Sequence, residues 1–319
     1  MAEGTNDPSF DLILHHYEGS LFSEKIRAIL GYKALPWCSV VISPVMPRPL
    51  LMPLTGGYRR TPVLQVGADV FCDTHVITEY LDERRHERPL HPEALGWAVR
   101  SLTQRADTHL FRVVVALCFQ PKAIEVMMRG LGEDMLQTFA ADRAELSRGS
   151  SGVTTLPPEV AQAELADELV RLETQLASTH WVCGGMPTIA DFAVYHCLWL
   201  LERNPVVAPL LMPYAAVRDW MQRIAGFGHA DHVSITAEAA LEVARAASPM
   251  ELLVHSGHLP EGVRVGAPVT VTPVDYGLVP VAGVLDYCTA HACAVLREDP
   301  QAGAVRVHFP RTGFRIDPA

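Results

Sequence analysis

The sequence predicts an α+β protein of several domains: an α/β domain, an all-α helical bundle domain and a small antiparallel β-rich domain. Strand and helix patterns alternate over the first quarter of the chain, helical periodicity dominates residues 95–247, and short β-branched runs follow residue 249. The length of 319 residues supports this division, since domains usually span about 100–200 residues. We expect the domains at residues 8–90, 93–247 and 250–319.

The composition excludes several classes of protein. Hydrophobic residues make up 49% of the chain and charged residues 19%, which favours buried cores over disorder. A net charge of −10 and only three lysines argue against a nucleic-acid partner, which requires a basic face. The N-terminus carries no secretory signal pattern, and no apolar run is long enough to span a bilayer. We therefore expect neither nucleic acid nor membrane as a partner.

The seven cysteines predict a reducing environment. Their number is odd, their spacing is irregular, and no C-x-x-C pair occurs. Free thiols of this kind are typical of cytoplasmic proteins. We expect a cytoplasmic location and no metal site, because paired cysteine spacing is the usual sign of structural zinc.

The first domain shows the order β-α-β, loop, β-β-α. The apolar run at residues 12–14 predicts a strand, and apolar residues at helical spacing predict a helix over 22–32. A second strand is expected at 37–42, and a hairpin at 62–66 and 69–72. Asp73 then caps a helix. His15 and His16 follow the first strand, where period-2 alternation predicts that one faces inward and the other outward.

The second domain is helical and is divided by breakers at residues 149–152 and 157–158. One helix is expected over 158–177. Another begins at Thr188, with Asp191 three positions on as a capping box. The run at 192–201 is almost entirely apolar, so this helix should lie in the core.

The last segment contains four β-rich runs, at 263–272, 279–287, 292–298 and 304–309, with a hairpin turn at 299–303. In the final run Val305, Val307 and Phe309 should face opposite to Arg306 and His308. We assign no function to this segment from the sequence.

Four short motifs in order resemble the glutathione transferase superfamily. They are the turn at 20–23, the segment Arg60-Thr61-Pro62 with Val63 and Leu64, the pair Asp73-Thr74 followed by a helix, and the cap at 188–191. The resemblance covers about residues 10–230. It implies a thioredoxin-like first domain, glutathione as cosubstrate, a small apolar electrophile as second substrate, and a homodimer.

The resemblance also implies how glutathione would bind. A cis bond before Pro62 would leave the Thr61 backbone free to pair with the cysteinyl backbone of glutathione. Thr74 lies at a helix N-terminus, where a carboxylate binds well, and Asp73 could pair with the ligand ammonium group. Alternatively, Asp73 is only a helix cap. The glycyl carboxylate needs a cation, for which Arg60 is a candidate beside Arg48 and Arg59.

Thiol activation requires a hydroxyl donor or a positive charge near the sulfur, since a free thiol is mostly protonated at neutral pH. We rank Ser20 first, at the start of the first helix, then Tyr17 and Ser23. Ser20 could instead be a simple N-cap. Position 20 is not cysteine, which argues against a thiol–disulfide mechanism.

The apolar substrate would lie beside the thiol. Aromatic and methionine side chains of the helical domain could line its pocket or could be ordinary core, and they are Trp97, Phe111, Phe119, Met127 and Met128.

Two other functions remain open from the sequence alone. One is a non-catalytic binding or assembly module, because fold does not determine function. The other is a glutathione-dependent isomerase or dehalogenase.

Overall fold

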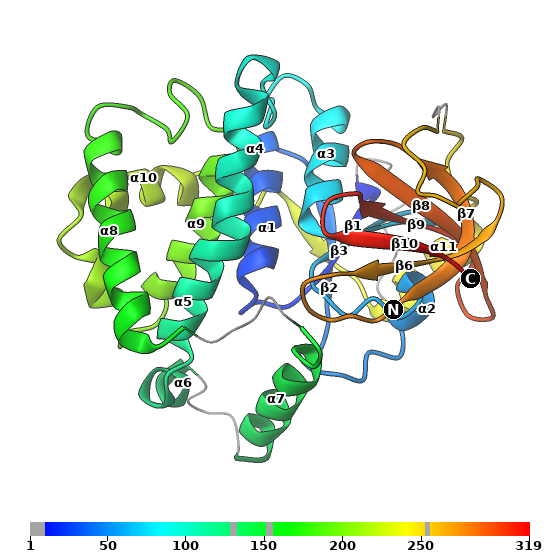
Figure 1. Ribbon diagram of the computed structural model, residues 1–319, viewed down its shortest axis with the longest axis horizontal. Helices are drawn as coiled ribbons and strands as arrows, with labels where there is room; N and C mark the ends of the chain where they lie inside the picture. Colours follow the sequence, from blue (N-terminus) through cyan, green and yellow to red (C-terminus); the bar gives the residue numbers. More distant parts are fainter. Residues whose placement is uncertain (1–9, 128–132, 151–155, 253–255) are drawn as a thin grey trace.

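The computed structural model describes residues 10–127, 133–150, 156–252 and 256–319. A helical half and a strand-rich half lie side by side (Figure 1). Helices α1 and α3 stand between the two halves. The candidate site lies where these halves meet.

The first part has the predicted order of elements. Strand β1 runs parallel to β2 and antiparallel to β3, and β3 and β4 form the predicted hairpin. The elements are β1 (Leu12–His16), α1 (Leu21–Lys33), β2 (Trp37–Val41), α2 (Met52–Thr55), β3 (Val63–Val66), β4 (Asp69–Cys72) and α3 (Thr74–Arg84). This is the thioredoxin-like arrangement that the sequence predicts.

Both faces of strand β1 are buried. Leu12 and Leu14 belong to the core shared with the helical half, while Ile13 belongs to a second core on the other face. His15 and His16 are each 1% exposed, so the prediction that one of them faces outward is wrong. Alternation is preserved, but helices and further strands cover both sides of the sheet.

The helical part is built on the predicted long helices. Its principal elements are α4 (Gly96–Arg105), a π-helical turn (Ala106–Leu110), α5 (Phe111–Cys118), α6 (Pro121–Met127), α7 (Glu133–Leu146), α8 (Pro158–Leu176), α9 (Ile189–Glu202) and α10 (Ala215–Ala225). Thr188 and Asp191 form the predicted capping box at the start of α9. Asp191 also accepts hydrogen bonds from Val182 N (2.8 Å) and Trp220 Nε1 (3.0 Å), which fixes the helix start in the core.

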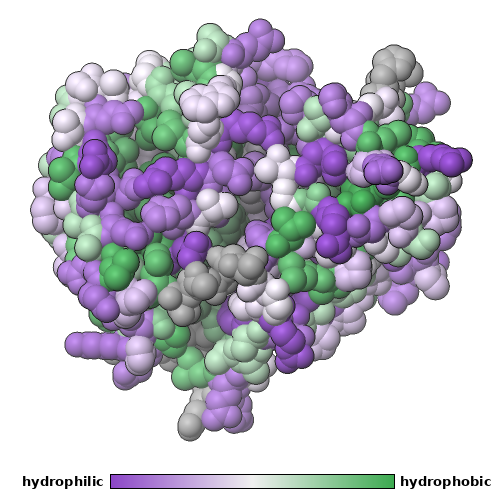
Figure 2. Space-filling model, in the orientation of Figure 1, coloured by the Kyte–Doolittle hydropathy of each residue, from purple (hydrophilic) through white to green (hydrophobic). Residues whose placement is uncertain are grey.

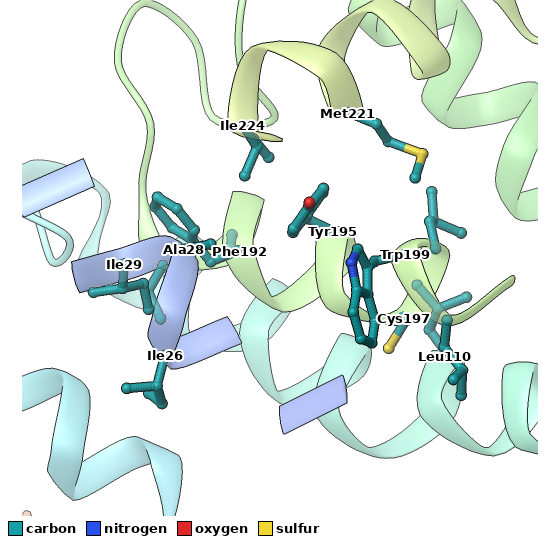
Figure 3. Close-up of a cluster of buried hydrophobic side chains, with 14 of the residues drawn as sticks. Ile26, Ala28, Ile29, Leu110, Phe192, Tyr195, Cys197, Trp199, Met221 and Ile224 are labelled. Atoms are coloured by element: carbon teal, nitrogen blue, oxygen red, sulfur yellow. The ribbon is translucent and has the colours of Figure 1, made fainter. Parts of the chain in front are cut away.

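The two halves share one apolar core. Figure 3 shows Ala28 and Ile29 of α1 near Phe192 of α9, with Ile224 of α10 beside them. Gly31 allows this contact, because a Cβ there would lie 2.0 Å from the Gly228 carbonyl oxygen. The position of α1, and with it the start of the candidate site, is thus determined by the helical half.

The C-terminal segment extends the first sheet. Its strands are β6 (Pro268–Pro273), β7 (Val281–Cys288), β8 (Ala292–Asp299), β9 (Gly303–Pro310) and β10 (Phe314–Pro318), and their neighbours pair antiparallel. Strand β9 pairs in parallel with β4, which gives one sheet in the order β10-β6-β7-β8-β9-β4-β3-β1-β2-β5, where β5 is His232–Ser234. The sequence did not predict β5, β10 or this continuity. Helix α11 (Ala237–Ala246) packs on the face opposite to α1.

A buried polar network fastens the β4–β9 junction. The Asp69 carboxylate accepts hydrogen bonds from His308 Nε2 (2.8 Å), Arg306 Nη1 (3.1 Å) and Met250 N (2.7 Å). The His308 ring stacks on Phe71 at 4.3 Å between centroids. His308 and Arg306 face away from Val305 and its neighbours as predicted, but this second face is buried too.

Within the described ranges, we find no helix with the length and apolar character needed to cross a membrane.

Candidate functional site

A cavity of about 80 Å³ lies where the first part, the helical part and the C-terminal segment meet. Its wall includes all five residues that the sequence suggested for ligand binding, namely Arg60, Thr61, Pro62, Asp73 and Thr74. They come from the residues before β3 and from the start of α3. The fold therefore brings the two motifs together.

The bond between Thr61 and Pro62 is cis, as the sequence predicts. The Thr61 hydroxyl accepts a hydrogen bond from Arg48 Nη1 (2.9 Å), and the same nitrogen donates to the Arg59 carbonyl oxygen (2.8 Å). Arg59 in turn pairs with Asp142 of α7 at 2.8 Å. Arg48 and Arg59 thus hold the loop that leads to Pro62, and only Arg60 of the three candidate arginines lines the cavity.

Asp73 is both a helix cap and a wall of the cavity. Its carboxylate accepts a hydrogen bond from His75 N (3.0 Å), and its φ of +97° lies in a region that residues other than glycine rarely adopt. Burial acts to raise the pKa of Asp73, but the hydrogen bond and charge of His75 and the Arg60 guanidinium outweigh it and lower the pKa to about 2. An ionised carboxylate held in unusual backbone geometry is typical of functional sites.

A buried charge pair lies behind Thr74. Lys25 of α1 is fully buried, and its ammonium group donates to Asp107 Oδ2 (2.6 Å) and to the Thr74 hydroxyl (3.4 Å). Asp107 belongs to the π-helical turn after α4, an element often found at functional sites. The cavity wall here is therefore polar and charged.

Three buried polar atoms of the cavity wall have no hydrogen-bond partner among the described residues. They are Asp107 Oδ1, the Tyr58 hydroxyl and Arg60 Nε. Burial raises the pKa of Tyr58 well above its usual value, so its phenol stays protonated and can donate. Unpaired buried polar groups are costly, so an acceptor beside Tyr58 and a donor beside Asp107 Oδ1 would stabilise the site.

Arg60 is held by the C-terminal segment as well as by Asp73. Its guanidinium donates to the Asp275 carboxylate and the Tyr276 carbonyl oxygen, and it stacks over the Tyr276 ring at 4.0 Å. The distance from Arg60 Nη1 to Asp73 Oδ2 is 3.6 Å. Burial raises the pKa of Tyr276 to about 12, so its phenol is neutral.

The three hydroxyl candidates lie apart from the cavity wall. Ser20 is 3% exposed and is the N-cap of α1, where its hydroxyl accepts from Ser23 N at 3.2 Å. The Ser23 hydroxyl is buried and has no hydrogen-bond partner among the described residues. Tyr17 is half-buried, and its carbonyl oxygen accepts from Ser20 N at 3.1 Å. The capping role of Ser20 is thus present, and its catalytic role stays a prediction.

The apolar candidates of the helical part divide into two groups. Phe111 lies 5.2 Å from the ring of Phe22, which lines the cavity. Phe119 and Met127 pack against the helical core, Trp97 is 85% exposed, and Met128 lies outside the described residues. Of the described candidates, only Phe111 therefore adjoins the cavity.

The sequence did not predict the rest of the cavity wall. The missed residues are Phe22, Tyr58, His75, Gln104, Asp107, Thr108, Asp275, Tyr276, Thr312, Gly313 and Phe314. Tyr58 lies two positions before Arg60, and His75 follows Thr74, so proximity to the motifs could have indicated both. The helical and C-terminal residues carry no comparable signal, because tertiary packing alone brings them there.

In the part of the chain that the structure describes, no group of three or more His, Cys, Asp or Glu residues is arranged to hold a metal ion. All seven cysteines are free thiols. On the face in Figure 2, hydrophilic and hydrophobic residues are interspersed over both halves of the molecule.

The fold and this site define a glutathione-transferase class of protein, and comparison with known families agrees. The family model for the glutathione S-transferase N-terminal domain matches residues 14–89, and that for the glutathione S-transferase C-terminal domain matches residues 137–223. A GST-like protein from Pseudomonas syringae is 36% identical, with a TM-score of 0.82 over 97% of this chain and 99% of that one. The chain belongs to the glutathione S-transferase family.

A glutathione S-transferase from Rhodospirillum rubrum F11 shares the fold at 18% identity, with a TM-score of 0.50. That match covers 67% of this chain and 87% of the other. The match to the Pseudomonas syringae protein is longer and includes most of the C-terminal strands. The C-terminal extension of the sheet is therefore shared with that protein.

Proposed function

We propose that this protein binds glutathione with Arg60, Thr61, Pro62, Asp73 and Thr74, and that it activates the bound thiol for attack on a small apolar electrophile. The observation that supports it is the meeting of these residues at one cavity beside a cis proline. Thr61 would offer its backbone to the cysteinyl unit, and Thr74 would hold the γ-glutamyl carboxylate. Arg60 would supply the cation that a ligand carboxylate requires.

Thiolate stabilisation would come from a hydroxyl group at the start of α1. Ser20 stays our first candidate because it begins the helix whose N-terminal partial charge favours an anion. Its hydroxyl accepts from Ser23 N, which leaves its own hydrogen free to donate to a sulfur atom. Tyr17 and Ser23 follow in that order.

Two measurements test this proposal. Calorimetric titration should give glutathione binding at millimolar concentration or below. Ser20→Ala should lower turnover about tenfold or more with little change in glutathione affinity, while Ser20→Thr, which keeps both the cap and the hydroxyl, should retain activity. Equal turnover in Ser20→Ala and the wild type would show that Ser20 does not activate the thiol. Tyr17 would then be the next candidate, or no hydroxyl group would have this role.

A second candidate, a non-catalytic binding or assembly module, is favoured by the size of the cavity. At about 80 Å³ it is smaller than the roughly 300–1,000 Å³ of common ligand pockets. An absence of binding heat at millimolar glutathione would favour this candidate. If glutathione binds and a substrate is converted without accumulation of a glutathione conjugate, product analysis would identify an isomerase or dehalogenase instead.

The proposal includes a homodimer in the cytoplasm. The seven unpaired cysteines support a reducing compartment. Light scattering coupled to size exclusion should give twice the chain mass of 35.0 kDa. A mass of one chain would refute the dimer without affecting the glutathione site.

A further inference from the structure

The C-terminal segment covers the cavity at two places. The loop of residues 274–280 joins β6 to β7, and the turn at 311–313 joins β9 to β10. The two lie side by side, since Val274 N donates to the Gly313 carbonyl oxygen at 3.0 Å. Asp275, Tyr276 and Phe314 all line the cavity. This part of the protein, to which the sequence assigned no role, therefore bounds the candidate ligand site.

The loop places its own carboxylate on Arg60, which lines the cavity. Asp275 and the Tyr276 carbonyl oxygen accept hydrogen bonds from Arg60 Nη2, and the Tyr276 ring covers the guanidinium face. A guanidinium binds a carboxylate strongly and with defined geometry. Asp275 thus takes the position that a ligand carboxylate would otherwise take on Arg60.

The two partners of this ion pair differ in exposure. The Arg60 side chain is 10% exposed, whereas that of Asp275 is 42% exposed. Asp275 can return to solvent at small cost, but the buried guanidinium would then keep only the more distant Asp73 carboxylate, at 3.6 Å, as its anion. Release of the loop therefore favours replacement of Asp275 by another anion.

The loop has a second attachment at the end of α7. Gly277 N donates to the Leu146 carbonyl oxygen at 2.7 Å. Gly277 has a φ of +59°, and a Cβ there would lie 3.0 Å from Leu146 Cδ1. The Gly277 amide is a direct reporter of whether the loop is attached.

We propose that the 274–280 loop is a displaceable cover in which Asp275 competes with the carboxylate of an anionic thiol ligand for Arg60. The inference rests on the proposed function in that glutathione is the probe ligand. Opening the cover enlarges a cavity that is otherwise too small for a tripeptide. The cover also selects ligands by charge, because a neutral thiol such as 2-mercaptoethanol provides no anion to replace Asp275.

Hydrogen–deuterium exchange of the full chain tests this. Saturating glutathione should accelerate exchange in residues 274–280, with Gly277 included, whereas ordinary ligand binding slows exchange at a site. The same concentration of 2-mercaptoethanol should have no effect. Slower or unchanged loop exchange in the presence of bound glutathione would refute the proposal that the ligand displaces the loop.

Asp275→Asn provides a second test. It should accelerate loop exchange without ligand and tighten glutathione binding about tenfold, the effect of weakening one charge-assisted hydrogen bond. Asp317→Asn is the matched control, because Asp317 pairs only locally with Arg315 on β10. Equal affinity and loop exchange in Asp275→Asn and the wild type would contradict the proposal.

A chemical readout separates this inference from the proposed function. Phenylglyoxal should modify Arg60 faster in Asp275→Asn than in the wild type, as followed by mass spectrometry of the peptide that contains Arg60. If glutathione binds neither protein, the proposed function fails, and the Arg60 reaction rate still decides whether Asp275 shields it. If Asp275→Asn does not fold, Tyr276→Leu should show the same faster modification of Arg60. An unchanged rate of modification would refute the proposal that the loop shields Arg60.

Discussion

Two buried aspartates of this protein differ in the completeness of their hydrogen bonding. Asp69, at the β4–β9 junction, accepts from His308, Arg306 and a backbone amide. Asp107, at the cavity, has Lys25 on one oxygen, while its other oxygen has no hydrogen-bond partner among the described residues. His196 Nε2 lies 3.8 Å from that oxygen, beyond hydrogen-bond distance.

This difference separates a structural cluster from a candidate ligand-binding one. A satisfied buried carboxylate fixes the fold, because each donor around it would be left unpaired by its removal. A partly satisfied carboxylate beside a cavity offers a hydrogen-bonding position to a ligand. Charge and burial alone do not distinguish the two, since both side chains are buried and both accept from a basic residue.

The largest expected effect is at the satisfied cluster. Asp69→Ala should lower the free energy of unfolding by about 3–5 kcal/mol, because it leaves Arg306 and His308 buried without their anion. Chemical denaturation measures the loss, with Asp317→Ala as an exposed control expected within about 0.5 kcal/mol of the wild type. A loss below about 1 kcal/mol for Asp69→Ala would remove the distinction between the two clusters.

Protonation of the buried histidines provides the next test. Burial lowers the pKa of His15 and of His196 to about 4, and that of His16 to about 3, while the unfolded chain keeps values near 6.5. Between about pH 6.5 and pH 4 the unfolded chain therefore binds more protons, and the free energy of unfolding falls as the pH falls. We expect a loss of several kcal/mol from pH 7 to pH 4.5.

The dependence of stability on pH also tests the surroundings of Asp107, because His196 lies 3.8 Å from its unpaired oxygen. His196→Asn should reduce the slope of stability against pH, because one neutral buried imidazole is removed from the titration. An NMR titration that gives His196 a pKa above 6 would contradict this. A protonated His196 would also give Asp107 a second cationic neighbour beside Lys25, which would weaken the contrast with Asp69.

The smallest expected effect concerns two tyrosine hydroxyls. Tyr287→Phe should lower the free energy of unfolding by about 1 kcal/mol, because the Tyr287 hydroxyl forms a hydrogen bond with His308 Nδ1 at 3.0 Å. Tyr58→Phe should lower the free energy of unfolding by less than Tyr287→Phe does, because the Tyr58 hydroxyl has no hydrogen-bond partner among the described residues. Thermal denaturation of the two variants measures the difference. If Tyr58→Phe is the more destabilising change, its hydroxyl is paired, and the ligand argument at that position fails.

Local patterns predicted the first two parts of the fold well. The capping pair Thr188 and Asp191, the cis bond before Pro62 and the order of the first strands and helices were all correct. These features depend on residues close together in the sequence, for which turn and cap chemistry is decisive. The error at His15 and His16 arose because alternation reveals the two faces of a strand but not what covers each.

The candidate site was predicted only in part for the same reason. Residues 60–62 and 73–74 could be recognised from short motifs, and they do meet at the cavity. Asp107 and Tyr276 could not, because each stands in an ordinary helical or loop sequence far along the chain. For Ser20 the sequence could not distinguish two roles, since a serine before a helix predicts a helix cap and a hydroxyl donor equally well.

The sequence by itself determined the family, the three kinds of secondary-structure region and the two motifs of the candidate site, because these depend on local periodicity and on short characteristic segments. Only the tertiary structure decided that β9 joins β4, which makes the last segment a continuation of the first sheet. That pairing carries Asp275 and Tyr276 to Arg60 across more than two hundred positions of sequence. Backbone hydrogen bonds between strands carry no local sequence code, so a contact of this range emerges only once the chain is folded.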